Sequence, residues 1–112
     1  MEVRSFSRNT QIAPKKARLI LDEIRGKRVD EAMALLRFMP TPHARIVAKA
    51  VRSAAANAEN NYNIPPRTLR VSQAFVGDGM TFRRMRPRAR GRADIMRRRR
   101  SNITIVVQDE VS

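Results

Sequence analysis

The architecture of this chain follows from residues 69–107, which read LRVSQAFVGDGMTFRRMRPRARGRADIMRRRRSNITIVV. Both ends of this segment have the alternation that is typical of β-strands. Leu69, Val71, Gln73 and Phe75 alternate with Arg70, Ser72, Ala74 and Val76, and Ile103, Ile105 and Val107 alternate with Thr104, Val106 and Gln108. Between them, residues 80–100 contain ten arginines and a single aspartate. We predict two strands that pair with each other, interrupted by Gly-Asp-Gly at 77–79 and joined by a long arginine-rich β-hairpin.

Arginine recurs at every second position in the middle of this hairpin, at Arg84, Arg86, Arg88, Arg90 and Arg92. In an extended strand this spacing places the side chains on a common face, about 6.5–7 Å apart. Two arms of about ten residues each would project roughly 30 Å. A disordered basic segment would have the same composition, but such segments lie at termini, whereas this one lies between two strands. We therefore favour the ribbon.

The remainder of the chain predicts one strand and three helices, with residues 2–10 as a short edge strand. The first helix begins at Ala13-Pro14 and ends at Gly26, and the second runs from an N-cap at Asp30 to Pro40. The third helix extends from 42 to 60, and its expected buried stripe is Val47, Val51, Ala54, Ala55 and Ala58. These elements predict an α+β fold, a single domain over 1–112 with helices covering one face of a small antiparallel sheet, and 80–100 as an extended arm.

Charge indicates the class of function. Lysine and arginine number 24 against 10 aspartates and glutamates, which gives a net charge of +14 and a pI near 11.8. Twenty of the cations are arginines, and residues 80–100 carry +9 of the total. Arginine grips phosphate with two parallel hydrogen bonds and stacks on bases, so this bias favours nucleic-acid binding over simple solubility.

Two further clusters of cations lie on the helical part of the chain. In the first turn of the first helix, where the helix dipole disfavours cations, the cluster is Lys15, Lys16 and Arg18. Around the Gly26 turn it is Arg25, Lys27 and Arg28. Nearby phosphates would offset the cost of the first cluster and could be gripped by the second. A solvated helix face and a charged C-terminal cap region, respectively, explain the same residues equally well.

Catalysis lacks the necessary groups, so we predict no enzyme, no cofactor and no metal. The one histidine, His43, follows Pro42 at a helix start, and neighbouring carboxylates such as Asp22 and Glu23 point apart. There is no cysteine for a disulfide or a thiolate metal site. No apolar run approaches the ~20 residues that span a membrane, and the N-terminal region has no hydrophobic signal segment. We expect a cytosolic protein without membrane insertion.

Several segments together resemble bacterial-type large-subunit ribosomal protein twenty-two. They are APKKARL (13–19), IRGK (24–27), AAANAENNY (54–62), RPRARGRA (86–93) and SNITIVV (101–107). The resemblance covers nearly the whole chain in the order of the family. It implies a body of three helices and a three-stranded sheet near the exit of the nascent-peptide tunnel, with a long hairpin that runs inward through ribosomal RNA.

The resemblance also implies residue roles. The tip would line the narrow part of the tunnel, opposite an extension of ribosomal protein four, with Arg88, Ala89, Arg90, Gly91, Arg92 and Ala93. The RNA-gripping stems would be Arg83, Arg84, Arg86, Arg97, Arg98, Arg99 and Arg100, although the unbroken run 97–100 departs from the mixed residues usual in the family. The implied partners are large-subunit ribosomal RNA, neighbouring ribosomal proteins and the nascent polypeptide, without homo-oligomers. Early subunit assembly and macrolide sensitivity are further associations of the family.

Two alternatives belong to other classes. An architectural DNA-binding protein could use the basic β-arm in the minor groove, but such arms often carry an apolar wedge at the tip, and this tip, RARGRA, has none. A binder of anionic membrane surfaces would need a helix that combines a basic face with bulky aromatic anchors. No expected helix has that combination.

Overall fold

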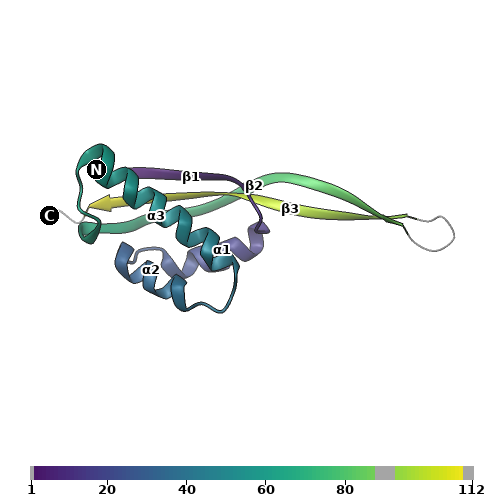
Figure 1. Ribbon diagram of the computed structural model, residues 1–112, viewed down its shortest axis with the longest axis horizontal. Coiled ribbons are helices and arrows are strands. Elements are labelled where there is room, and N and C mark those ends of the chain that lie inside the picture. The colour runs from purple at the N-terminus through teal and green to yellow at the C-terminus, as the bar shows by residue number, and fades with distance from the viewer. Residues whose placement is uncertain (1, 88–92, 110–112) are drawn as a thin grey trace.

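The computed structural model describes residues 2–87 and 93–109, with the backbone alone at 9, 80–87 and 93–98. The elements follow in the order β1 (Glu2–Thr10), α1 (Pro14–Ile24), α2 (Val29–Phe38), α3 (His43–Tyr62), the 3-10 turn η1 (Pro66–Thr68), β2 (Leu69–Pro87) and β3 (Ala93–Asp109). Three helices pack against a three-stranded antiparallel sheet, from which β2 and β3 extend together as a long ribbon (Figure 1). The predicted α+β class is confirmed.

The C-terminal strand β3 is the centre of the sheet, in the order β1-β3-β2. On one side Val3 pairs with Val107, and on the other Ala74 pairs with Ile105. The N-terminal strand β1 is an edge strand, as predicted. Because β3 has a partner on both sides, its residues 103–107 are all buried. The strand predicted from the alternation at 103–108 is confirmed.

The core lies between the sheet and the helices. From the sheet, Ile103, Ile105 and Val107 are fully buried, and from α1, Leu21 and Ile24. The predicted stripe of α3 is confirmed as buried, and it is extended by two further alanines: the members are Ala44, Val47, Ala50, Val51, Ala54, Ala55 and Ala58. Since alanine holds a neighbour off by only one methyl group, α3 lies close against β1 and β3.

The turn after α1 is tied to the sheet by two backbone hydrogen bonds. Gly26 has a φ of 83°, a left-handed conformation that suits glycine. Its N–H donates to the Val71 carbonyl at 2.9 Å, and the Val71 N–H donates to the Lys27 carbonyl at 2.8 Å. The α1–α2 connection therefore continues the hydrogen bonding of β2, and α1 is held at a defined position over the sheet.

The predicted helix ends need three corrections. Asp30 is not an N-cap, because α2 begins at Val29 after Arg28. Asp30 lies in the first turn instead, where its negative charge interacts favourably with the helix dipole. The third helix begins at His43 rather than at 42. It also continues to Tyr62 and ends at Asn63, whose φ of 57° is the left-handed C-terminal conformation.

The predicted alternation of the second strand is wrong beyond Val71. Leu69 and Val71 face the core, but the register shifts between Val71 and Gln73, and Ala74 is then buried instead of Gln73. The extra residue of this β-bulge moves Gln73 and Phe75 to the opposite face of the sheet. The bulge is supported by the Ser72 hydroxyl, which donates to the Val106 carbonyl at 3.1 Å.

Gly-Asp-Gly at 77–79 does not end the strand, contrary to the prediction. The register shifts between Asp78 and Thr81, so the segment is a second irregularity, and pairing resumes from Thr81 with Arg99 to Pro87 with Ala93. The Asn102 amide donates to the Asp78 carbonyl at 3.3 Å beside this bulge. The arm is thus continuous with the body strands. The radius of gyration is 17.0 Å, against about 13 Å for a compact domain of this length.

Candidate nucleic-acid interface

The arm places arginine positions on both faces of its ribbon. Residues directly opposite in an antiparallel pair share a face. Arg83 lies opposite Arg97, whereas Arg84 lies opposite Met96 and Arg86 opposite Asp94, on the other face. Like charges directly opposite destabilise a sheet unless anions surround them, so this register suits a ribbon placed between two polyanionic surfaces.

The predicted tip lies largely outside the described residues. Arg88, Ala89, Arg90, Gly91 and Arg92 all fall there, and Ala93 is described only as the partner of Pro87 in the ribbon. Of the arginines predicted to alternate across 84–92, the structure describes Arg84 and Arg86, which share a face. The role of the tip stays a prediction.

The N-terminal end of α1 lies at the base of the arm (Figure 1). Close before it, the Thr10 hydroxyl is 2.8 Å from the Ser101 hydroxyl and donates to the Ser101 carbonyl at 3.0 Å. The cations of this first turn are all exposed: Lys15, Lys16 and Arg18. Together with the exposed Arg99 they extend the basic character of the arm onto the body.

The second predicted cluster is at the opposite end of α1. Arg25 has structural partners there, because its Nη1 donates to the Asp22 carboxylate at 2.7 Å and its Nε and Nη2 donate to the Ala74 carbonyl at 3.2 and 2.6 Å. It fastens α1 to β2. Lys27 and Arg28 are exposed in the following turn. The two clusters of α1 are therefore separate sites, about 16 Å apart along an 11-residue helix.

A third cationic surface, which was not predicted from the sequence, lies on α3. Arg45, Lys49 and Arg52 are exposed at i, i+4 and i+7, on the side of the helix away from its alanine stripe. This spacing could have identified them, because it is the helical period of one face. With Arg37 of α2 they surround a hollow of about 1170 Å³ between α2 and α3. We call this hollow the α2–α3 groove.

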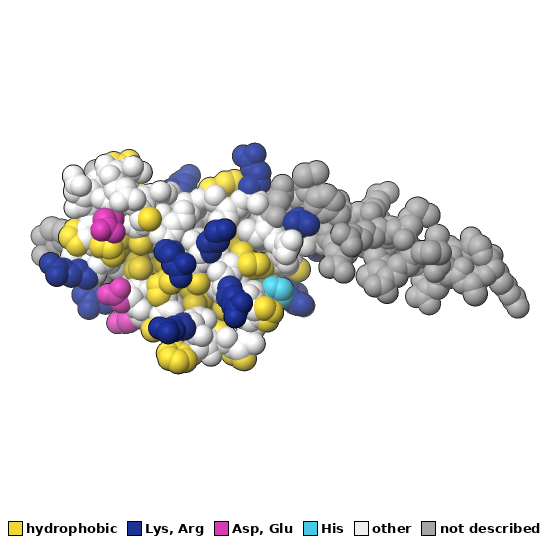
Figure 2. Space-filling model, in the orientation of Figure 1, with side chains coloured by type: hydrophobic (Ala, Val, Ile, Leu, Met, Phe, Trp, Pro, Cys, Tyr) yellow, Lys and Arg dark blue, Asp and Glu magenta, His cyan; other side chains and the backbone are white. Residues whose placement is uncertain are grey.

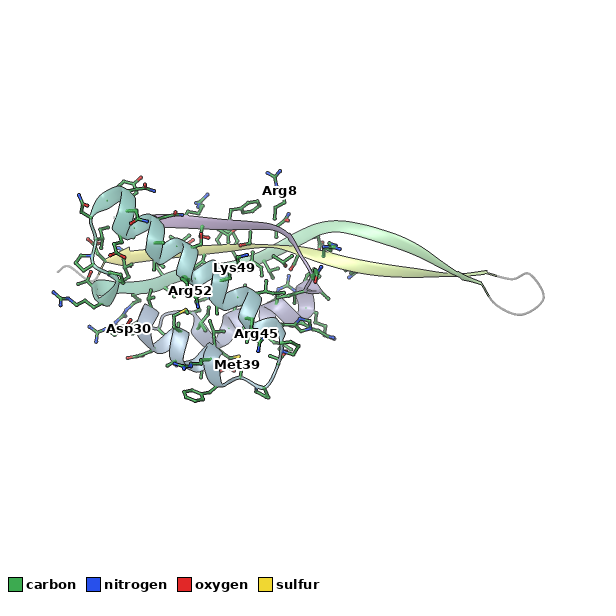
Figure 3. The ribbon with its side chains drawn as sticks, viewed as in Figure 1. Arg8, Asp30, Met39, Arg45, Lys49 and Arg52 are labelled. Atoms are coloured by element: carbon green, nitrogen blue, oxygen red, sulfur yellow. The ribbon has the colours of Figure 1, made fainter. Side chains whose placement is uncertain are left out.

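The floor of the α2–α3 groove is apolar and its edge is charged. Met33, Leu36, Met39, Ala44 and Ala48 contribute the apolar atoms. Figure 2 shows dark-blue cationic side chains around yellow apolar surface on this side of the body, and Figure 3 labels Arg45, Lys49 and Arg52 along α3, with Met39 and Asp30 on the α2 side. Asp30 is the one acidic residue of the described lining.

Within the described ranges, other kinds of site are not evident. No three histidine, cysteine, aspartate or glutamate side chains gather there in a way that could hold a metal ion. His43 is half-buried at the start of α3, where its backbone N–H donates to the Thr41 hydroxyl at 3.3 Å. None of the described helices is both long and apolar enough to cross a membrane. The dominant surface feature is positive charge.

The part of the sequence that forms the body and the ribbon matches a known family. The sequence profile described as ribosomal protein L22p/L17e matches residues 5–108. The chain belongs to this ribosomal protein family. The membership confirms the resemblance seen in the motifs, and it makes the chain a structural protein rather than an enzyme.

The similarity to individual members of the L22p/L17e family extends over whole chains. Large ribosomal subunit protein uL22 of Desulforamulus reducens is 50% identical over 110 residues, which cover 98% of this chain and 97% of that protein. The protein of the same name from Thermoanaerobacter pseudethanolicus is 52% identical, over 98% of this chain and 99% of its own. That of Dehalococcoides mccartyi is 47% identical, over 97% of this chain and 100% of its own.

Proposed function

We propose that the chain is a structural constituent of the large subunit of the cytoplasmic ribosome, which binds ribosomal RNA and supports subunit assembly. The observation that carries this proposal is the arm, because residues 80–100 hold +9 of the net charge of +14 and the paired strands β2 and β3 extend beyond the packed body. The names of the relatives, large ribosomal subunit proteins, support the same assignment.

The mechanism that follows is electrostatic and depends on shape. Arginines that neutralise phosphates release condensed counterions, which favours binding at low salt. With arginine positions on both faces, the arm can hold together RNA segments that would otherwise repel each other. A-form RNA hides its base edges in a deep, narrow groove, so contact with RNA helices is made mainly to the backbone. The stems are Arg83, Arg84, Arg86, Arg97, Arg98, Arg99 and Arg100.

The body adds further phosphate contacts. Lys15, Lys16 and Arg18 continue the arm at its base, and Arg25, Lys27 and Arg28 form a separate contact. The tip, from Arg88 to Ala93, lines the exit tunnel and meets the nascent polypeptide. This finer part rests on the resemblance to the family, and neighbouring ribosomal proteins are the remaining partners.

Sedimentation of a tagged copy from cells tests the proposal. We expect the protein in the large-subunit fraction at a ratio of one per subunit, resistant to a moderate salt wash, with ribosomal RNA as the bound nucleic acid. Crosslinkers placed at position 90 should capture nascent chains on translating ribosomes, whereas the same crosslinker at position 38, on the body, should not. Recovery with chromosomal DNA or as a free dimer would instead support a DNA-architectural role.

A further inference from the structure

The face of the sheet opposite the helices carries a pair of exposed phenylalanines. Phe6 of β1 and Phe75 of β2 are 53% and 47% exposed, and both pair with Thr104 of the central strand. The three residues thus form one row across the sheet. Since neighbouring strands are about 4.8 Å apart, the two phenylalanine backbones are about 10 Å apart. We call this row, with its neighbours Arg4 and Arg8, the aromatic face.

The backbone of β2 places the second ring on the aromatic face. Phe75 is on this face because the bulge between Val71 and Gln73 exchanges the faces of the side chains that follow it. Val106 also belongs to this face, because it is 2% exposed and yet is not part of the core beneath the helices. The side chains of β1 and β2 therefore shield the central strand while the two rings themselves remain open.

Positive charge borders the rings. Arg4 is exposed two residues before Phe6, the spacing that keeps side chains on one face of a strand. Arg8 is exposed two residues after Phe6, where the register of β1 shifts between Ser7 and Thr10. The Arg8 guanidinium carbon lies 5.9 Å from the centroid of the Phe6 ring, within the range of a cation–π contact. Figure 3 shows Arg8 on β1, on the side of the strand away from α2.

We propose that the aromatic face stacks unpaired RNA bases on Phe6 and Phe75 while Arg4 and Arg8 pair with the flanking phosphates. This inference rests on the proposed RNA-binding function and adds to it the class of RNA bound, which is single-stranded. Aromatic rings on a sheet stack bases of any sequence, provided that the bases are not already stacked in a helix. The arm, in contrast, has the charge to bind both single-stranded and double-helical RNA.

A protein partner on this face is the competing occupant. It would bury the apolar area of the rings without needing them to be flat, and leucine would replace phenylalanine at little cost. A stacked RNA base needs a planar ring, so leucine at these positions should lose base stacking and tyrosine should retain it. The comparison of the two substitutions therefore separates stacking from general apolar contact.

The test uses the full chain and two probes, a single-stranded RNA of about 12 nucleotides with a central 2-aminopurine and a duplex of the same length. The matched control is Phe38→Leu, because Phe38 is 83% exposed but lies on α2. We expect Phe6→Leu and Phe75→Leu each to weaken single-strand binding by about fivefold or more and to reduce 2-aminopurine quenching. Duplex binding, and both assays with Phe38→Leu, should be unchanged.

The tyrosine variants keep the inference falsifiable if a leucine variant proves to be unstable. Phe6→Tyr and Phe75→Tyr should retain the affinity and the quenching of the unmodified chain. If the leucine variants bind both probes as the unmodified chain does, the stacking site does not exist, and the proposed function is untouched. If the unmodified chain binds neither probe, the proposed RNA-binding function fails as well.

Discussion

Replacing residues 83–98 by a two-residue Asn-Gly turn should separate RNA binding from folding. The change removes eight arginines and one aspartate, which lowers the formal net charge from +14 to +7. If each of these arginines neutralises one phosphate, the slope of log affinity against log salt should become shallower by about 6 to 7 units. The affinity for large-subunit RNA should fall most at low salt.

The body should survive this replacement. All members of the buried core lie at residues 3–76 or 103–107, outside the removed segment. The pairing of Asp78 with Ser101 and the contact of Thr10 with Ser101 also remain. We therefore expect helical circular dichroism and one cooperative thermal transition.

Fluorescence anisotropy over a series of salt concentrations measures the slope, and calorimetry measures unfolding. A full-length variant with the arm arginines changed to lysine is the matched control, because it keeps the charge and should keep the slope within about one unit. An unchanged slope after the replacement would refute the electrostatic role of the arm. Loss of the cooperative transition would refute the independence of the body.

Three smaller changes test other parts of the structure. Gly26→Ala should destabilise the fold by about 1 kcal/mol, because a Cβ is disfavoured at a φ of 83° even though no atom lies within 4 Å of its position; an unchanged melting temperature would contradict this. Ala54→Leu should cost about 1–3 kcal/mol in chemical unfolding, since Ala54 is fully buried against the sheet, and a neutral result would mean that α3 can move away. Changing Arg45, Lys49 and Arg52 together to glutamine should reduce the salt slope by about 3 units or less if the α2–α3 groove meets RNA, and no reduction would exclude that surface from the RNA interface.

Local patterns in the sequence predicted most of the elements. Pro14 at a helix start and Gly26 after the helix end mark α1 because each residue's backbone preference acts within one turn. The alanine-rich stripe of α3 and the alternating residues of β3 were equally clear, since each pattern repeats at the period of its own element. The arginine-rich arm could be recognised from charge and position alone.

The misplaced features depend on contacts between segments that are far apart in the chain. The bulge at Ser72 inserts one residue relative to β3, and only the pairing of the two strands reveals the insertion. Gly-Asp-Gly at 77–79 looks like a stop because glycine weakens strands, but pairing with β3 carries β2 through it. The cations of α3 that line the α2–α3 groove were not predicted, because the groove forms only where α2 packs beside α3.

The element types, the basic arm and the family could be predicted from consecutive residues, because side-chain period, composition and motif order are local properties. Which face of the sheet each residue occupies depends on how the strands pair. A single inserted residue moves every side chain that follows it in a strand to the opposite face, and its effect depends on the register with a partner 34 residues away. Phe75 is the clearest case, since the alternation grouped it with Leu69 and Val71, whereas the register placed it on the opposite face of the sheet.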